Sequence, residues 1–233
     1  MKRSILLILF CGVLVLFANA QNEKRSLQKL NLLIIGDSNG TFEYSWPQQL
    51  KQMLPNATIV NRSISGNTIG FDNGGKVELN TLKNINRYLE EAFNKFGPQN
   101  GFDYMLINLG TNDTKRVFIS QQNEVPRNMS LLIQQIKKFI HDHQKQNPKI
   151  CIITPSPMDE SKVNVGKYGG GDLRIQKNNK QFKKVATSNK VGFIDTYSTL
   201  KNGFSDKTTD GVHLNEKAQI ELATQIVNYI NKK

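Results

Sequence analysis

A serine near the start of the chain and a histidine near its end lie in short segments whose residue types suit nucleophilic catalysis. Ser38 lies in residues 36–40 (GDSNG), and His213 lies in residues 210–214 (DGVHL). A serine hydroxyl is a weak nucleophile at neutral pH, so it needs a base within hydrogen-bond distance, and that base needs an orienting partner. A histidine can take and return the proton because it titrates near about 6.5. Asp210, three residues before His213, can accept a hydrogen bond from the second ring nitrogen.

Two further segments carry the hydrogen-bond donors that such a reaction needs. Attack on a carbonyl carbon places negative charge on the carbonyl oxygen, and each donor fixed at that point is worth about 10²–10³ in rate. The side-chain amide of Asn112 in residues 110–113 (GTND) and the backbone N–H of Gly66 in residues 63–68 (SISGNT) are donors of this kind. Each of the four segments alone is also typical of an ordinary turn. The functional interpretation therefore depends on their meeting in space.

Short apolar runs alternate with helical patterns along the whole chain. The predicted strands are residues 32–35, 57–60, 104–107, 150–154 and 191–195, and the clearest helical patterns cover residues 46–54, 77–96, 126–140 and 218–230. Regular alternation of this kind predicts an α/β fold with a parallel sheet and helices on both faces. Five strands joined by right-handed crossovers favour a flavodoxin-like three-layer α/β/α sandwich with the strand order 2-1-3-4-5. All four segments then fall at the carboxyl ends of strands, near the switch point between the first and third strands.

Two details of this fold follow from residue patterns. In the last helix, the apolar spacing predicts that Ile220, Ala223, Val227 and Ile230 face inward. Residues 156–172 show no clear period and contain three consecutive glycines, so we expect a long mobile loop near the site.

The chain is basic, with a formal net charge of +12. A basic chain first suggests nucleic acid as a partner, but these charges are mostly lysines spread along the sequence. Their densest stretch carries Lys177, Lys180, Lys183 and Lys184 at helical spacing, which favours a solvated helix face. Affinity for anionic polymers or surfaces is the alternative, and we expect no nucleic-acid partner.

The N-terminus has the pattern of a signal peptide. Lys2 and Arg3 precede an apolar run at residues 5–17, and residues 18–20 (ANA) give a small-x-small cleavage site. We therefore expect a signal peptide at residues 1–20, a single domain at residues 21–233, and a secreted or periplasmic protein without stable membrane insertion after cleavage. Cys151 is the only cysteine of that domain, which excludes an internal disulfide. We expect Cys151 to be buried and the protein to be a monomer.

Together, the segments resemble the ordered blocks of a known family. Residues 36–38 (GDS), Gly66, residues 110–113 (GTND) and residues 210–213 (DGVH) are similar to the four blocks of the SGNH, or GDSL-like, hydrolases. The resemblance implies Ser38 as nucleophile, His213 as base and Asp210 as its partner. It also implies an oxyanion hole formed by the N–H groups of Ser38 and Gly66 and the side chain of Asn112, with no metal or cofactor. One departure is Asn39, where many members have a hydrophobic residue.

The resemblance implies a secreted serine esterase that hydrolyses O-acyl esters, above all acetyl esters on carbohydrate, through an acyl-enzyme. Its partner would be a small-molecule or carbohydrate ester. A lysophospholipase or thioesterase acting on lipid acyl groups is the alternative, as is a sugar O-acyltransferase. Four residues near the motifs could form the wall of a sugar pocket: Tyr44, Trp46, Phe71 and Asn73. Trp46 also fits the apolar face of the first helix.

Two other folds or functions match part of the pattern. Residues 36–40 also satisfy the G-x-S-x-G turn of α/β-hydrolases. That fold is disfavoured because the serine follows the first strand, and because Asp210 and His213 are only three residues apart. A non-catalytic flavodoxin-like module would bind FMN at the same switch point, with the Ser-His-Asp set as a coincidence.

Overall fold

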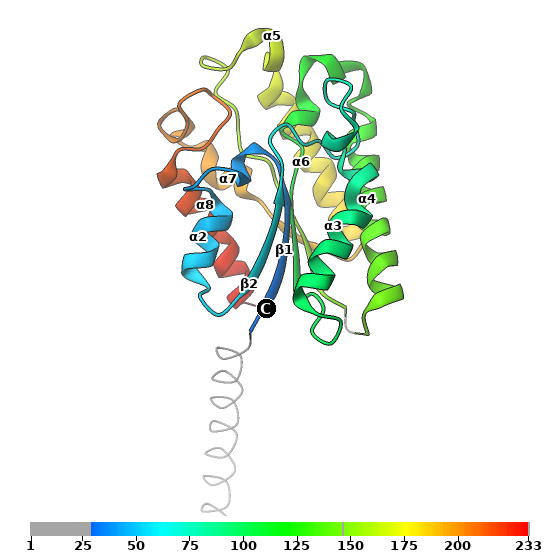
Figure 1. The fold of residues 1–233 in the computed structure, drawn as a ribbon. Helices are drawn as coiled ribbons and strands as arrows, with labels where there is room; N and C mark the ends of the chain where they lie inside the picture. Colours follow the sequence, from blue (N-terminus) through cyan, green and yellow to red (C-terminus); the bar gives the residue numbers. More distant parts are fainter. Residues whose placement is uncertain (1–28, 146, 233) are drawn as a thin grey trace, which may run out of the picture.

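The computed structural model describes residues 29–145 and 147–232, so the predicted signal peptide at residues 1–20 lies outside the described residues. The centre of the molecule is a five-stranded parallel sheet with the order β2-β1-β3-β4-β5 (Figure 1). The strands are β1 (Asn31–Gly36), β2 (Thr58–Ser63), β3 (Tyr104–Asn108), β4 (Lys149–Ile153) and β5 (Gly192–Ile194). The predicted fold class and strand order are therefore confirmed.

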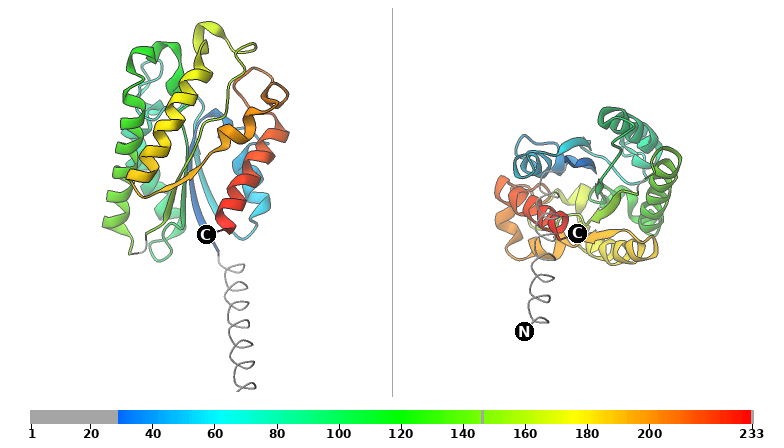
Figure 2. Two further views of the ribbon diagram at one scale, coloured as in Figure 1. Left: turned by 180° about the vertical axis from the view of Figure 1, so that it is seen from behind. Right: turned by 90° about the horizontal axis from the view of Figure 1, so that it is seen from below.

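Helices cover both faces of the sheet (Figures 1 and 2). One layer consists of α3 (Thr81–Phe96), α4 (Glu124–His143) and α6 (Gly171–Ser188). The other consists of α2 (Trp46–Met53), α7 (Thr196–Lys201) and α8 (Glu216–Asn231). This arrangement is the three-layer sandwich that the alternation of strands and helices predicts.

The inner strand β1, which lies between β2 and β3, contributes side chains to two hydrophobic cores. Leu33 and Ile35 pack in the core under α3 and α4, whereas Leu32 and Ile34 pack in the core under α2 and α8. Successive side chains of a strand point to opposite faces, so a strand covered on both sides must be apolar at every position. The unbroken apolar run of β1 therefore suits an inner position in the sheet, between β2 and β3, with helices on both faces.

Three sequence-based expectations about helices need correction. Helix α3 begins at Thr81 rather than at residue 77, because the Asn80 side chain caps it by accepting the N–H of Lys83, and Val77–Leu79 forms a separate 3₁₀ turn, η2. In α8, Ile220 is 40% exposed, so its predicted inward position is wrong, whereas Ala223 and Ile230 are buried and Val227 is partly buried.

The buried row of α8 runs instead through Ala218, Leu222, Ile226 and Ile230, one turn apart. Ile220 lies two positions after Ala218, which is roughly 200° around a helix of 3.6 residues per turn, so it faces away from the sheet.

The third correction concerns residues 156–172. They contain the short helix α5 (Val165–Tyr168) and the first residues of α6, so the expectation of one long mobile loop is wrong. Met158, Val163 and Tyr168 are buried in a small apolar cluster that includes Val212, beside His213. A four-residue helix is too short to show a sequence period, which is why the pattern did not reveal it.

The expectations for Cys151 and for the lysines of α6 are met. Cys151 is fully buried in β4. The four lysines of α6 are exposed, as a solvated helix face requires. Within residues 29–145 and 147–232, no helix is long and apolar enough to cross a membrane.

Candidate active site

Ser38 lies in a tight turn directly after β1. It is the first residue of the 3₁₀ turn η1 (Ser38–Gly40), and the Asp37 side chain caps this turn by accepting the N–H of Asn39 at 3.0 Å. Glycine at residue 36 leaves room for the neighbouring strand, because a Cβ there would lie 2.6 Å from the hydroxyl oxygen of Ser63 on β2 and that side chain would have to move. The turn can therefore pack closely against the neighbouring strand, with Ser38 held at the carboxyl end of the sheet.

The structure brings the three predicted catalytic residues into one chain of hydrogen bonds. His213 Nε2 lies 2.9 Å from Ser38 Oγ, and His213 Nδ1 lies 2.6 Å from Asp210 Oδ2. The other carboxylate oxygen of Asp210 accepts the backbone N–H groups of Val212 at 2.9 Å and of His213 at 2.8 Å. This geometry is that of a nucleophile, a base and an orienting carboxylate.

Two opposing effects act on the carboxyl group of Asp210. Partial burial disfavours its charged form, but the hydrogen bonds from His213 and Val212 outweigh burial and hold the pKa of Asp210 below its usual value. Asp210 therefore remains a carboxylate well into the acid range, where it can keep orienting the imidazole.

The predicted oxyanion donors meet at the same end of the sheet. Asn112 begins the 3₁₀ turn η3 (Asn112–Thr114) after β3, and its Nδ2 donates to the carbonyl oxygen of Asn67 at 3.0 Å. Asn67 in turn donates to the carbonyl of Gly36 at 3.2 Å, which joins the Gly66 loop to the end of β1. A side-chain amide carries two N–H bonds, so Asn112 keeps one for a ligand.

A buried carboxyl group holds the Gly66 loop against η3. Both oxygens of Asp113 accept the N–H of Ile69, at 2.9 and 3.1 Å. Burial raises the pKa of Asp113 to about 7, against the opposing effect of the backbone hydrogen bond from Ile69. Asp113 thus fixes the spacing between the segments that carry Gly66 and Asn112.

Asn39 is a site residue whose role the sequence did not reveal. Its side-chain oxygen accepts the N–H of Leu214 at 2.9 Å, and its side-chain nitrogen donates to the carbonyl of Val212 at 3.4 Å. These two residues flank His213, so the Asn39 side chain, next to Ser38 in the sequence, binds the loop that carries the base. The only signal in the sequence was the polar residue at a position where the family usually has a hydrophobic one.

Tyr168 is a second such residue. Its hydroxyl donates to Asn112 Oδ1 at 3.1 Å, which leaves the amide nitrogen as the end that can face a ligand. Arg174 steadies this part of the chain by donating to the carbonyls of Tyr168 and Gly169, at 3.2 and 2.8 Å. No sequence pattern connects Tyr168 with Asn112, because the contact joins residues 56 positions apart.

The four residues expected to wall a sugar pocket have different positions. Trp46 is fully buried in the core and Phe71 is buried against Phe118, with ring centroids 4.6 Å apart, so neither is available to a substrate. Asn73 donates to the carbonyl of Gly66 and thus supports the oxyanion loop. Tyr44 alone is exposed.

An unexpected residue, Phe42, connects Tyr44 with the base. Phe42 stacks on Tyr44 with centroids 5.3 Å apart, and it meets the ring of His213 edge to face at 5.5 Å. Phe42 and Tyr44 therefore form an aromatic edge beside His213.

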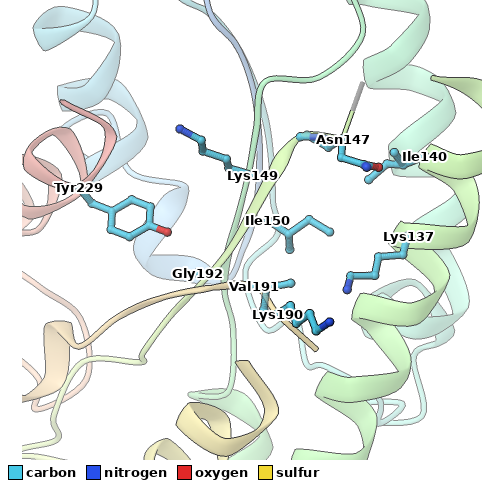
Figure 3. Close-up of a pocket in the computed structure, with 10 residues that line it drawn as sticks. Lys137, Ile140, Asn147, Lys149, Ile150, Lys190, Val191, Gly192 and Tyr229 are labelled. Atoms are coloured by element: carbon cyan, nitrogen blue, oxygen red, sulfur yellow. The ribbon is translucent and has the colours of Figure 1, made fainter. Parts of the chain in front are cut away.

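A cavity of about 520 Å³ lies elsewhere, at the amino ends of β4 and β5 (Figure 3). Lys137, Lys149 and Lys190 are among its lining residues, and none of the predicted site residues lines it. Across residues 29–145 and 147–232, no group of three or more His, Cys, Asp or Glu side chains is placed to hold a metal ion.

Comparisons with known proteins agree with the fold. Among solved structures, similar folds include a carbohydrate acetylesterase from Sinorhizobium meliloti (TM-score 0.70, 23% identity, covering 88% of this chain and 99% of that chain). They also include an aryl esterase from M. smegmatis (TM-score 0.72, 20% identity, with the same coverage of 88% and 99%). A putative arylesterase from Agrobacterium tumefaciens has a TM-score of 0.69 and 24% identity, again covering 88% and 99%.

A search of curated protein sequences found no match. The family model of the GDSL-like Lipase/Acylhydrolase family, in contrast, matches residues 34–219, which include all the predicted site residues. That match covers well over half of the chain and confirms the resemblance drawn from the four segments. The chain therefore belongs to the GDSL-like lipase/acylhydrolase family, a family of carboxylic ester hydrolases.

Proposed function

We propose that this protein is a secreted serine esterase that removes acyl groups, above all acetyl groups, from carbohydrate esters. The observation that carries the proposal is the chain of hydrogen bonds from Ser38 through His213 to Asp210, with distances of 2.9 and 2.6 Å. Secretion rests on the sequence of residues 1–20 alone.

In the first half-reaction, Ser38 Oγ bonds to the ester carbonyl carbon while His213 Nε2 takes the hydroxyl proton. The carbonyl electron pair moves to oxygen, and the resulting oxyanion accepts hydrogen bonds from the N–H groups of Ser38 and Gly66 and from Asn112. The bond from carbon to the alcohol oxygen then breaks, and the imidazolium gives its proton to the departing alcohol. Ionised Asp210 stabilises the imidazolium throughout.

In the second half-reaction, water replaces the alcohol. His213 takes one proton from the water while its oxygen bonds to the acyl carbon, and the same donors hold the second oxyanion. The bond to Ser38 Oγ breaks, the serine oxygen regains its proton from His213, and the acid leaves. The chemistry uses only side chains and backbone groups of this chain.

A carbohydrate substrate is supported by two observations. The aromatic edge formed by Phe42 and Tyr44 lies beside His213, and aromatic faces pack well against sugar rings. One of the structures with a similar fold is a carbohydrate acetylesterase.

The nucleophile is tested with a fluorophosphonate probe, which forms a covalent bond with an activated serine. The wild-type protein should gain one probe mass at Ser38 and lose its esterase activity, whereas Ser38→Ala should neither react nor hydrolyse esters. Ser205→Ala, which removes an exposed hydroxyl elsewhere, should behave as wild type. Turnover by Ser38→Ala at the wild-type rate would exclude this mechanism.

The substrate is tested with acyl chains from acetyl to palmitoyl on sugar and lipid alcohols. We expect kcat/KM to be highest for acetyl sugars and to fall as the acyl chain lengthens. A maximum at long chains on lipid alcohols would identify a lipid acyl hydrolase instead. Transfer of the acyl group to an added acceptor sugar, in preference to water, would identify an O-acyltransferase.

A further inference from the structure

A buried lysine beside the oxyanion donors has no counter-ion within contact distance. Lys115 as a residue is only 7% exposed, and within the described part of the chain its ammonium makes no hydrogen bond and no carboxylate lies within 4.0 Å of it. The carbon stem is buried while Nζ keeps contact with solvent. An ammonium that is held on a buried stem, open to solvent and without a counter-ion, is available to an anionic group of a ligand.

Lys115 is connected to Asn112 in two ways. Its backbone N–H donates to the carbonyl of Asn112 at 3.2 Å, so both residues belong to the turn after β3. Its Nζ lies 5.9 Å from the ring centroid of Tyr168, whose hydroxyl donates to Asn112 Oδ1 at 3.1 Å. The ammonium thus lies near the ring of Tyr168, whose hydroxyl orients the proposed oxyanion donor Asn112.

A second lysine adds positive charge at the same ring. Lys167 is exposed on α5, and its Nζ lies 5.2 Å from the ring centroid of Tyr168. The nearest acidic residues of this segment are already engaged. Glu160 accepts the N–H groups at residues 170 and 172, and Asp172 pairs with Lys201 at 2.6 Å.

The charged groups around Lys115 do not offset the effect of burial on its ammonium. Burial, together with repulsion from Lys167, lowers the pKa of the Lys115 ammonium to about 8, although Asp113 and Asp37 act in the opposite direction. Tyr168 adds no negative charge, because burial raises the pKa of its hydroxyl well above the usual range.

We propose that Lys115, assisted by Lys167, forms a subsite for a carboxylate carried by the ester substrate, so that this enzyme prefers acidic esters such as acylated sugar acids. The inference rests on the proposed esterase function and specifies its substrate class. The carboxylate would pair with the two ammonium groups while the ester carbonyl faces Asn112. The pairing would replace water around a cation that the fold already holds partly dehydrated, which reduces the cost of binding.

The subsite is tested with two matched pairs of esters. In the first pair, 4-acetoxybenzoate is compared with its methyl ester, so that the charge lies on the alcohol side. In the second, 4-nitrophenyl hemisuccinate is compared with 4-nitrophenyl methyl succinate, so that the charge lies on the acyl side. The readout is the ratio of kcat/KM for the charged ester to that for its neutral partner, because the ratio cancels effects of a variant on general activity.

Lys115→Met keeps the length of the side chain and removes its charge. We expect this variant to lower the ratio about tenfold in one of the two pairs, since a charge-assisted hydrogen bond is lost. Lys115→Arg should retain most of the preference, and Lys167→Met, on the exposed helix α5, should lower the ratio by a smaller factor. Lys183→Met, a matched charge removal on the exposed face of α6, should leave the ratio at the wild-type value.

The pH dependence gives a second readout on the wild-type protein. The preference for the charged ester should be present at pH 6–7 and fall as pH rises through about 8, because the Lys115 ammonium then loses its proton. Ratios that are equal in wild type and Lys115→Met for both pairs would overturn the subsite, although hydrolysis of the neutral esters would leave the esterase function intact. Failure of the wild type to hydrolyse any of the four esters would overturn the esterase function and the subsite with it.

Discussion

At the scale of single residues, the side-chain amide of Asn112 has three hydrogen-bonding positions with three different roles. One N–H binds Asn67, the oxygen binds Tyr168, and the second N–H remains for the oxyanion. Asn112→Ala is expected to lower kcat by about 10²–10³, because one oxyanion donor is lost. Tyr168→Phe keeps the amide but releases its oxygen, so it should lower kcat by a smaller factor with little change in KM. Steady-state kinetics of both variants, with the melting temperature measured in parallel, checks this prediction.

An equal loss of activity in both variants would show that Tyr168 does more than orient the amide. A loss in Asn112→Ala that only follows the loss of folded protein would assign Asn112 a purely structural role.

Asp113 makes stability depend on pH in a direction opposite to that of most carboxylates. Its pKa is raised from 3.8 to about 7, so between these values the folded state holds a proton that the unfolded state has released. Stability contributed by this group therefore falls as pH rises from about 4 to 7. Asp113→Asn removes the titration, so its free energy of unfolding relative to wild type should rise by about 4 kcal/mol over this range.

Urea unfolding of both proteins at several pH values from 4 to 8 measures this difference. Buried Asp37, whose pKa is also raised, is present in both proteins. A difference that stays constant with pH would mean that Asp113 is already ionised in the folded state at low pH.

The meeting of Ser38, His213 and Asp210 could be predicted from the sequence because the proposed chemistry restricts these positions to few residue types. Serine, histidine and aspartate at the ends of predicted strands already pointed to one reaction. Asn39 and Tyr168 could not be predicted in this way. Their roles depend on contacts with residues 175 and 56 positions away, and many residue types make hydrogen bonds.

At the scale of elements, the turn η1 and the loop before α8 behave as one unit. Asn39 binds Val212 and Leu214 on either side of His213, and its own carbonyl accepts Gln219 Nε2 at 3.0 Å from within α8. Asn39→Leu introduces the hydrophobic residue usual in the family but loses both side-chain bonds. We expect kcat to fall about tenfold, since a loss of 1–2 kcal/mol in positioning the base corresponds to roughly that factor.

Asn39→Asp keeps the acceptor for Leu214 and loses only the donor, so its kcat should lie between those of Asn39→Leu and wild type. Probe labelling of Ser38 separates positioning from folding, because a well-folded variant with a misplaced base should label slowly at an unchanged melting temperature. Wild-type labelling in Asn39→Leu would contradict the prediction.

The strands and their order could be predicted because each is a short apolar run, and parallel connections follow strict rules of handedness. Boundaries and short helices could not. The start of α3 depends on the cap at Asn80, and α5 has too few residues for a period. Ile220 was misplaced because apolar residues occur on more than one side of α8.

At the scale of the whole molecule, one sheet separates two cores, and β1 contributes side chains to both. Because β1 packs in both cores, unfolding of one core should remove support from the other. We therefore expect a single cooperative unfolding transition. Trp46, the only tryptophan, lies in the core under α2 and α8 and reports that side by fluorescence, while circular dichroism reports the whole chain. The two urea midpoints should coincide.

Ile133→Ala provides the sharper form of this test, since Ile133 is fully buried in the opposite core. The variant should lose about 2–5 kcal/mol and shift the Trp46 transition together with the circular dichroism transition. A Trp46 midpoint that stays at the wild-type value would instead indicate two independently unfolding parts and contradict the prediction of one domain.

The 175 positions between Ser38 and His213 also have a consequence for how the protein is made. Ribosomes add about 5–20 residues per second, so the serine turn exists for roughly 10–35 seconds before its base has been synthesised. During that interval the growing chain carries an unactivated hydroxyl and cannot attack the esters of the cell that produces it. The order of the segments thus delays catalytic competence until translation has passed the final loop.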